Sequence, residues 1–271
     1  MSGFEDLTKT LTLDPIEVNL FRGYSPPVAS GRIYGGQVVA QALIAAYQTV
    51  ADLRCHSLHC YFIRPGDPKA PVLYQVERAR DGKSFATRRV AAIQHGEQIF
   101  NLAASFQRVE EGFEHQFSPP DVPSPDTILA DEEKTWILHS AIDIRPVGPF
   151  TPPGGPSNAG KSSWMRAKAP MGEDEGFNQA VLAYASDAGI LESAMWPHDL
   201  TFETPGLQYA SLDHAMWFHR PVRMSDWHLY VQDSPSASGA RGFARGLIYA
   251  QDGALVASVA QEGLLRLRKP A

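Results

Sequence analysis

The stretch LAYASDAGILESAM, residues 182–195, decides how the second half of the chain is expected to fold. Residues 181–184 are apolar and strand-like, and apolar residues then recur at helical spacing until Pro197 ends the pattern. The sequence therefore predicts a strand that leads into a helix, with Asp187 in the first turn of that helix. A carboxylate there caps free N–H groups and interacts favourably with the helix dipole, so Asp187 has a structural explanation beside any catalytic one.

The two halves of the chain resemble each other. YFIRP at residues 61–65 matches WFHRP at 217–221, and TRRVAAIQHG at 87–96 matches ARGLIYAQDG at 244–253. The two matches have nearly the same separation, 156 and 157 residues. A repeat of this length is too long for a solenoid and indicates that a whole domain was duplicated.

Each half contains one apolar helix and a series of strand-like runs between turn signals. The first helix opens at Gly35 and Gly36 and is apolar on nearly all sides, so it is expected to be buried. Strands are predicted at 55–63, 71–80, 84–94 and 97–107, and again at 211–220, 226–233, 240–250 and 254–267. A buried helix with an antiparallel meander, present twice, predicts an α+β double hot-dog fold, in which each curved sheet wraps around its helix and the sheets pair edge to edge.

Prolines mark the boundary between the halves. The predicted domains are an N-terminal hot-dog at residues 1–115, a proline-rich linker at 116–160 and a C-terminal hot-dog at 161–271. Within the linker, only ILHSAIDIRPV at 137–147 is expected to be ordered, and the linker is expected to carry little of the core.

Composition excludes several classes of function. A formal net charge of −6 gives no electrostatic footprint for nucleic acid. No apolar run is long enough to span a bilayer, and the first residues lack a signal-peptide pattern, so we expect a cytoplasmic protein with no membrane association. Cys55 and Cys60 are an odd number of residues apart in a predicted strand, so they are expected on opposite faces and unpaired, as suits a reducing compartment.

Polar residues on apolar surfaces are the candidates for chemistry. Gln261 is the one polar side chain on the apolar, odd-numbered row of the last predicted strand. A buried amide needs hydrogen-bond partners, which a sheet backbone or a catalytic site can provide. Ser211 and Asp213 are expected on one face of their strand and His214 on the other, which argues against a Ser-His-Asp triad. Aligning the two halves places Gly36 opposite Asp187 and Ala104 opposite Gln261, so the first half lacks both polar groups.

Two motifs lack the structural context that their usual function requires. GPSNAGKS at 155–162 matches the phosphate-binding loop pattern, but prolines precede it and Pro170 interrupts the segment in which a helix must follow. CHSLHC at 55–60 contains metal-binding residue types, but in a strand Cys55 and His59 lie roughly 13 Å apart. We expect neither a metal nor another cofactor.

The chain resembles bacterial acyl-CoA thioesterase II, the TesB type, through GRIYGGQVVAQAL, YFIRPGD, RDGKSFATRRVAAIQ, GFEHQ, LAYASD, LDHAMWFHRP and VASVAQEG. The resemblance implies a double hot-dog enzyme that hydrolyses acyl-CoA, with Asp187, Ser211 and Gln261 holding the attacking water. Ser211 departs from the threonine that is usual in this family. The resemblance also places the CoA phosphates near basic groups, for which Arg64, Arg88 and Arg220 are the candidates, and implies a homo-oligomer, a dimer or a tetramer.

Two other functions remain open. A hot-dog dehydratase acting on enoyl or hydroxyacyl thioesters would use His214 or His219 together with a carboxylate. A non-catalytic module would bind acyl-CoA without turnover.

Overall fold

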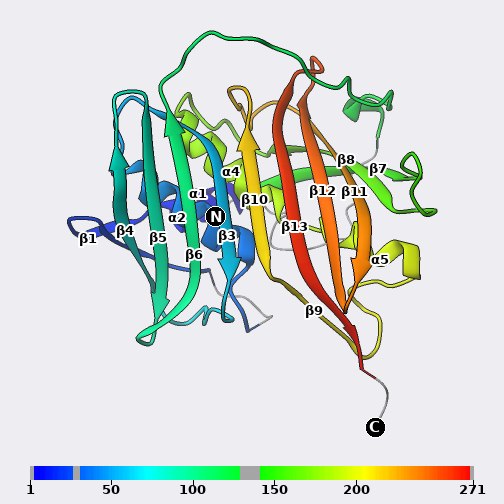
Figure 1. Cartoon of the computed structure of the whole chain (residues 1–271), viewed down its shortest axis with the longest axis horizontal. Coiled ribbons are helices and arrows are strands. Elements are labelled where there is room, and N and C mark those ends of the chain that lie inside the picture. Colours follow the sequence, from blue (N-terminus) through cyan, green and yellow to red (C-terminus); the bar gives the residue numbers. More distant parts are fainter. Residues whose placement is uncertain (1–2, 27–30, 129–140, 269–271) are drawn as a thin grey trace.

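The computed structural model describes residues 3–26, 31–128 and 141–268, and a single antiparallel sheet runs through it (Figure 1). The first half comprises α1 (Gly3–Leu11), β1 (Asp14–Glu17), β2 (Leu20–Gly23), α2 (Gly35–Tyr47), β3 (Arg54–Phe62), β4 (Val72–Asp81), β5 (Phe85–Gln94) and β6 (Glu97–Gln107). The second half comprises β7 (Ile142–Phe150), β8 (Gly160–Ala167), α4 (Glu175–Ser186), α5 (Glu192–Met195), β9 (Leu207–Ser211), β10 (Asp213–Phe218), β11 (His228–Ser238), β12 (Arg241–Ala250) and β13 (Leu255–Leu267). Short 3₁₀ turns lie at Pro125–Thr127 and Trp196–His198.

The two repeats join at the centre of the sheet. The strand order is β1-β2-β4-β5-β6-β3-β10-β13-β12-β11-β8-β7, with β9 also paired to β13. At the joint, β3 pairs with β10 in antiparallel register, with Ala215 opposite His59. The two hot-dog sheets therefore pair edge to edge, as the repeat predicts.

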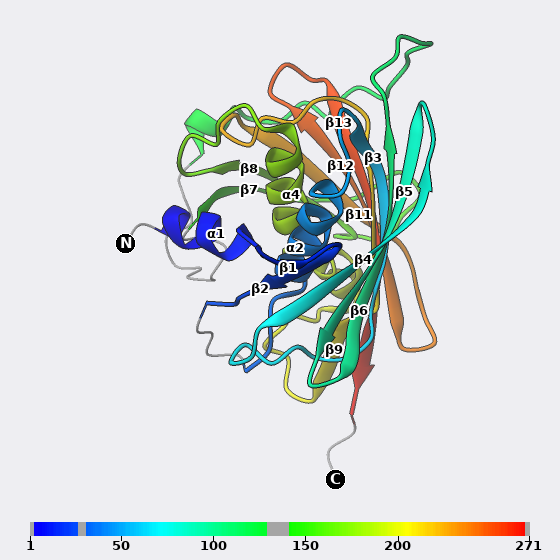
Figure 2. The same cartoon turned by 90° about the vertical axis from the view of Figure 1, so that its left-hand side faces the viewer.

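Helices α2 and α4 lie side by side on the concave side of the sheet (Figure 2). Every residue of α2 from Gly36 to Leu43 is buried, and so is every residue of α4 from Asn178 to Ser186. Both helices are apolar on nearly all sides because sheet and partner helix surround them.

The prediction for residues 181–187 was wrong. These residues are the end of α4, and Asp187 is its C-cap rather than part of a first helical turn. Because α4 is buried all round, its apolar run lacks the periodicity that separates a helix from a buried strand. The helix starts upstream at Asp174, whose carboxylate accepts a hydrogen bond of 2.6 Å from the N–H of Phe177.

Two β-bulges interrupt the alternation of the central strands. The register between β3 and β6 shifts between Cys55 and Ser57. As a result Cys55 and Cys60 are both buried, and the expectation that they face opposite sides was wrong. Both remain free thiols.

The segment predicted as a linker contributes a strand. β7 pairs with β8, and Ile142 at its start is fully buried. Residues 137–140 of the piece expected to be ordered lie outside the described residues. Residues 108–124 carry no regular structure and pass from the end of β6 over the upper ends of the central strands to the second repeat (Figure 1). The side chain of Gln116 anchors this crossing by accepting from the N–H of Leu255 and donating to the carbonyl of Gly253.

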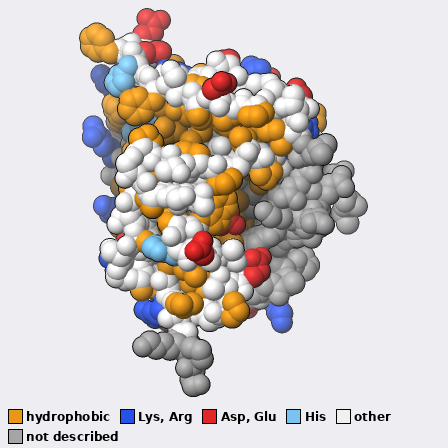
Figure 3. All heavy atoms as spheres, turned by 90° about the vertical axis from the view of Figure 1, so that its right-hand side faces the viewer, with side chains coloured by type: hydrophobic (Ala, Val, Ile, Leu, Met, Phe, Trp, Pro, Cys, Tyr) orange, Lys and Arg blue, Asp and Glu red, His pale blue; other side chains and the backbone are white. Residues whose placement is uncertain are grey.

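The side of the molecule at which β11 and α5 lie, the right-hand side of Figure 1, carries apolar side chains in several patches among polar ones (Figure 3). Within the described part of the chain, no helix combines the length and apolar character that crossing a membrane requires. The GPSNAGKS motif runs into strand β8 and not into a helix, so it lacks the context of a phosphate-binding loop.

Candidate active site

Asp187 lies where the last turn of α4 meets the first turn of α2. A Cβ atom added to Gly35 would lie 2.7 Å from Oδ2 of Asp187, and one added to Gly36 would collide with the carbonyl oxygen of Tyr184. The glycine pair therefore allows the start of α2 to approach the end of α4 closely. The N–H of Gly36 faces the Asp187 carboxylate. The side chain of Tyr34, the N-cap residue of α2, makes no capping bond, and the positive end of this helix is directed at the Asp187 carboxylate.

The end of α4 is held by two tyrosine hydroxyls. Tyr34 donates to the carbonyl oxygen of Tyr184 at 2.8 Å, and Tyr230 donates to that of Ser186 at 3.0 Å. These are carbonyls of the last helical turn, which lack partners within the helix. The two bonds fix the backbone immediately before Asp187.

Gln261 and Ser211 lie in direct contact beside Asp187. Nε2 of Gln261 donates to Oγ of Ser211 at 2.9 Å, and both side chains also face the Asp187 carboxylate. Gln261 is 1% exposed and belongs to the inward row of β13, as its strand pattern predicts. The structure therefore brings Asp187, Ser211 and Gln261 together from α4, β9 and β13.

The second bulge explains how Ser211 and His214 come to share a face. Ser211 pairs with Gly263 and Ala215 pairs with Ala260, so the chain contains one extra residue between them. Oδ1 of Asp213 accepts a hydrogen bond of 2.7 Å from the N–H of Glu262, which binds the bulge to β13.

His214 consequently points inward, against the expectation that it lies on the face opposite Ser211. Its Nδ1 is 2.5 Å from Oε1 of Gln261, and its Nε2 is 3.0 Å from Oγ of Ser186. Strict alternation could not reveal this contact. The bulge of β3 recurs one repeat later, but both bulges are recognised only from the strand pairing in the structure.

Burial raises the pKa of Asp187 above its ordinary value. His214, the Gln261 amide, the Gly36 N–H and the Ser211 hydroxyl oppose this rise by stabilising the ionised form, in that order. The residue as a whole is partly buried, but its Oδ1 is shielded from solvent and accepts no hydrogen bond from the described residues. The site thus holds a carboxylate of raised basicity with one oxygen not engaged by these groups.

The first repeat does not reproduce this arrangement. Because Asp187 ends its helix, its counterpart is not Gly36 but Gln48, the C-cap of α2. At that end of the helix pair the hydroxyl of Tyr47 donates to Oε1 of Gln179 and accepts from the N–H of Cys55. The first half therefore lacks the carboxylate, as the sequence comparison concluded, although through a different residue.

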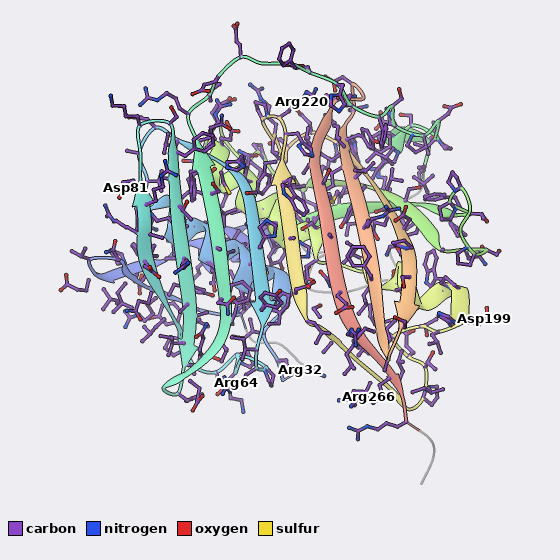
Figure 4. All side chains as sticks on the ribbon, viewed as in Figure 1. Arg32, Arg64, Asp81, Asp199, Arg220 and Arg266 are labelled. Carbon is purple, nitrogen blue, oxygen red and sulfur yellow. The ribbon has the colours of Figure 1, made fainter. Side chains whose placement is uncertain are left out.

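The three candidate arginines occupy separate positions. Arg64 and Arg220 lie at opposite ends of the strands (Figure 4). Arg64 is half-exposed and pairs with Glu97 at 3.0 Å. It lies two residues after Phe62, whose ring packs against the start of α2, since it would be 3.0 Å from a Cβ atom added to Gly35.

Arg88 is 1% exposed and donates to Thr49, Arg80, Thr87 and Asp81. These bonds engage its guanidinium inside the protein, so the geometry does not support Arg88 as a ligand group.

Arg220 lies at the upper end of the strands (Figure 4) and contacts Glu114 of the crossing segment at 3.4 Å. A surface hollow of about 770 Å³ is lined there by Arg220, His219 and residues 110–117. None of Asp187, Ser211 and Gln261 lines it. Arg220 is therefore not brought to the candidate site.

The residues of CHSLHC divide between the faces of β3. Both cysteines are buried, whereas His56 bonds Ser105 and His59 packs edge-on against Trp217.

Comparison with known proteins gives a consistent result over the whole chain. Residues 136–264 match the model of the acyl-CoA thioesterase family, and residues 24–107 match that of the acyl-CoA thioesterase N-terminal domain. Human acyl-coenzyme A thioesterase 8 is 42% identical, over 97% of this chain and 89% of that protein. The crystal structure of acyl-CoA thioesterase II TesB2 from Mycobacterium marinum superposes with a TM-score of 0.87 at 42% identity, covering 97% of this chain and 99% of that one.

A more distant structure supports the fold alone. A protein of unknown function with a hot dog fold from Alicyclobacillus acidocaldarius superposes with a TM-score of 0.81 at 18% identity, covering 98% of this chain and 99% of that one. With the sheet wrapped around α2 and α4, these matches confirm the predicted fold and the predicted resemblance: the chain belongs to the acyl-CoA thioesterase family and has a double hot-dog fold.

Proposed function

We propose that this protein hydrolyses acyl-CoA thioesters to a carboxylic acid and CoA, with Asp187 as general base and with Ser211 and Gln261 holding the attacking water. The observation that carries the proposal is Oδ1 of Asp187, which is shielded from solvent and accepts no hydrogen bond from the part of the chain that the structure describes. It lies beside Ser211 and Gln261, whose side chains contact each other. The family membership and the names of the relatives support the same reaction.

The reaction needs few groups because a thiolate is a good leaving group. Asp187 takes a proton from water as the water oxygen forms a bond to the thioester carbonyl carbon. The carbonyl oxygen becomes an oxyanion, and we assign its stabilisation to the positive N-terminal end of α2, where the side chain of the N-cap residue Tyr34 makes no capping bond. Collapse of this intermediate breaks the carbon–sulfur bond, and the CoA thiolate leaves and takes up a proton.

The position of Asp187 suits the role of a base. The negative end of α4 and burial both disfavour the ionised carboxylate and so increase its proton affinity. The Gly36 N–H and the Gln261 amide act in the opposite sense and favour the ionised carboxylate. This balance provides a base whose pKa is moved toward the working pH.

The CoA phosphates require cations near the site. Arg64 stays our candidate because it lies on the loop beside the start of α2, where the N–H of Ile33 bonds the carbonyl of Gly66 at 3.0 Å. Arg32 lies at the same end of the molecule as Arg64 and adds a second positive charge there (Figure 4).

The dehydratase alternative is less well supported by the geometry. His214 uses both ring nitrogens within the protein, and His219 bonds Ser258 on the outer face of the sheet. Neither imidazole is placed to exchange a proton with a substrate beside Asp187.

The direct test is a thiol-release assay of the purified chain with acyl-CoAs of several chain lengths, alongside hydration of an enoyl-CoA by the same preparation. We expect release of free CoA from at least one acyl-CoA and no hydration. Hydration without hydrolysis would support the dehydratase. Acyl-CoA binding with no turnover of any substrate would support the binding module and contradict the proposal.

A further inference from the structure

The His214 side chain forms a buried bridge between α4 and the proposed catalytic amide. It is 0% exposed, and its two ring nitrogens contact Gln261 on one side and Ser186 on the other. A buried imidazole with unsatisfied nitrogens would be costly, so these two contacts account for its burial. The bridge links the strand that carries Gln261 to the residue immediately before Asp187.

The contact with His214 determines which end of the Gln261 amide faces Asp187. The two ends of an amide have nearly the same shape, but one accepts hydrogen bonds and the other donates them. Oε1 can only accept, so Nδ1 of His214 carries the hydrogen in this contact. Nε2 of Gln261 is then directed toward Ser211 and the Asp187 carboxylate.

The opposite orientation of the amide would be unproductive. The carbonyl oxygen of Gln261 would face the Asp187 carboxylate, and the Ser211 hydroxyl would have to donate its hydrogen to Gln261. In the observed orientation the Ser211 hydroxyl accepts from Nε2 and keeps its own hydrogen to donate toward the Asp187 carboxylate.

We infer that His214 is a positioning residue for the hydrolysis, which acts by holding the Gln261 amide with its N–H groups toward Asp187. This inference rests on the proposed function. His214 does not touch the reacting atoms, so its loss changes kcat through Gln261 and leaves KM for acyl-CoA nearly unaltered.

A pair of amide substitutions separates positioning from simple filling of space. In His214→Asn the side-chain N–H₂ occupies the place of Nδ1 and still donates to Gln261. In His214→Gln it occupies the place of Nε2, so the contact with Ser186 remains and the donor to Gln261 is lost. We expect kcat within about threefold of wild type for His214→Asn and about 10²-fold lower for His214→Gln, the usual effect of a small misplacement of a catalytic group.

The matched control is His228→Gln. His228 is also buried, at 2% exposed, and bonds only the carbonyl of Asp226 through Nδ1 among the contacts described. Its substitution is expected to lower the melting temperature and leave kcat unchanged. Equal kcat losses in His214→Asn and His214→Gln, or no loss in folded His214→Gln, would overturn the inference.

A double-mutant cycle tests the route of the effect and remains decisive if His214→Asn folds poorly. Measured at a pH above the acid limb, where a change in the Asp187 pKa no longer alters kcat, adding His214→Gln to Gln261→Leu is expected to slow kcat no more than about twofold beyond Gln261→Leu alone, because His214 positions Gln261. An additive loss would contradict the inference. Wild-type protein without thioesterase activity would instead contradict the proposed function, so the two failures are distinguishable.

Discussion

The carboxylate of Asp187, at the C-terminal end of α4, faces the backbone N–H of Gly36, at the N-terminal end of α2. The C-terminal end of α4 thus meets the N-terminal end of α2, and the candidate site contains groups from both repeats. A single hot-dog unit of this chain could not form it, since the base lies in one half and the helix start in the other.

Substitution of Gly36 tests this close approach. In Gly36→Ala the new methyl group would collide with the Tyr184 carbonyl and lie 2.6 Å from the Tyr34 ring. We expect a loss of about 1–3 kcal/mol in the free energy of unfolding, as for other overpacked sites, together with a fall in kcat. Thermal unfolding and thiol release measure the two effects. Gly112→Ala, whose methyl would meet nothing within 4 Å, is the control, and equal behaviour of the two variants would refute the close approach.

The pH dependence of kcat reports on Asp187. Its pKa is raised by burial, so kcat is expected to fall as the pH drops through a value above that of an ordinary aspartate, where the base becomes protonated. Gln261→Leu removes a group that lowers this pKa, and the acid limb of the kcat profile should therefore shift to higher pH. A limb that stays in place or moves to lower pH would show that the Gln261 amide does not stabilise the Asp187 carboxylate.

Two arginine substitutions are expected to have opposite signatures. Arg64→Ala should raise KM for acyl-CoA roughly tenfold with little change in melting temperature, the worth of one charge-assisted bond to a phosphate. Arg88→Met should lower stability by about 1–3 kcal/mol, because the buried acceptors of Thr49, Arg80 and Thr87 lose their donor, and leave KM unchanged. Steady-state kinetics and thermal unfolding of both variants check this, and a KM increase in Arg88→Met alone would reverse the assignment.

Asp187→Asn is expected to stabilise the fold at neutral pH. A raised pKa means that the ionised carboxylate is less favourable in the folded chain than in the unfolded one, so its stabilising contribution is present at low pH and lost as the pH rises through the folded pKa. Asparagine does not ionise and avoids this loss. Chemical unfolding should show the variant more stable than wild type by about 0.5–2 kcal/mol at pH 7, with a smaller difference at pH 4. A less stable variant at pH 7 would mean that burial does not penalise the carboxylate.

The strands could be predicted from the sequence because turn signals and the internal repeat agree on them. The run at 97–107 coincides with β6, and that at 240–250 differs from β12 by one residue. The helix α4 could not be recognised from its periodicity, because sheet and partner helix bury it on all sides. The N-cap at Asp174 was the local signal for its start.

The sequence named Asp187, Ser211 and Gln261 as candidates, but it did not predict how they are arranged. Gln261 could be identified because β13 keeps its alternation of buried and less buried side chains from Ala257 to Gly263. His214 could not, because the bulge after Ser211 reverses the alternation and depends on pairing with β13. The meeting of Asp187 with Gly36 depends on how the two helices pack, which no local pattern records.

The rate of hydrolysis by Asp187→Asn tests the central claim most directly. With the acyl-CoA that wild type hydrolyses best, Asp187→Asn is expected to lower kcat by roughly 10²- to 10⁴-fold, the usual contribution of a general base. Because the variant is expected to remain folded, this loss would reflect the missing base. Turnover within a fewfold of the wild-type kcat would contradict the role assigned to Asp187.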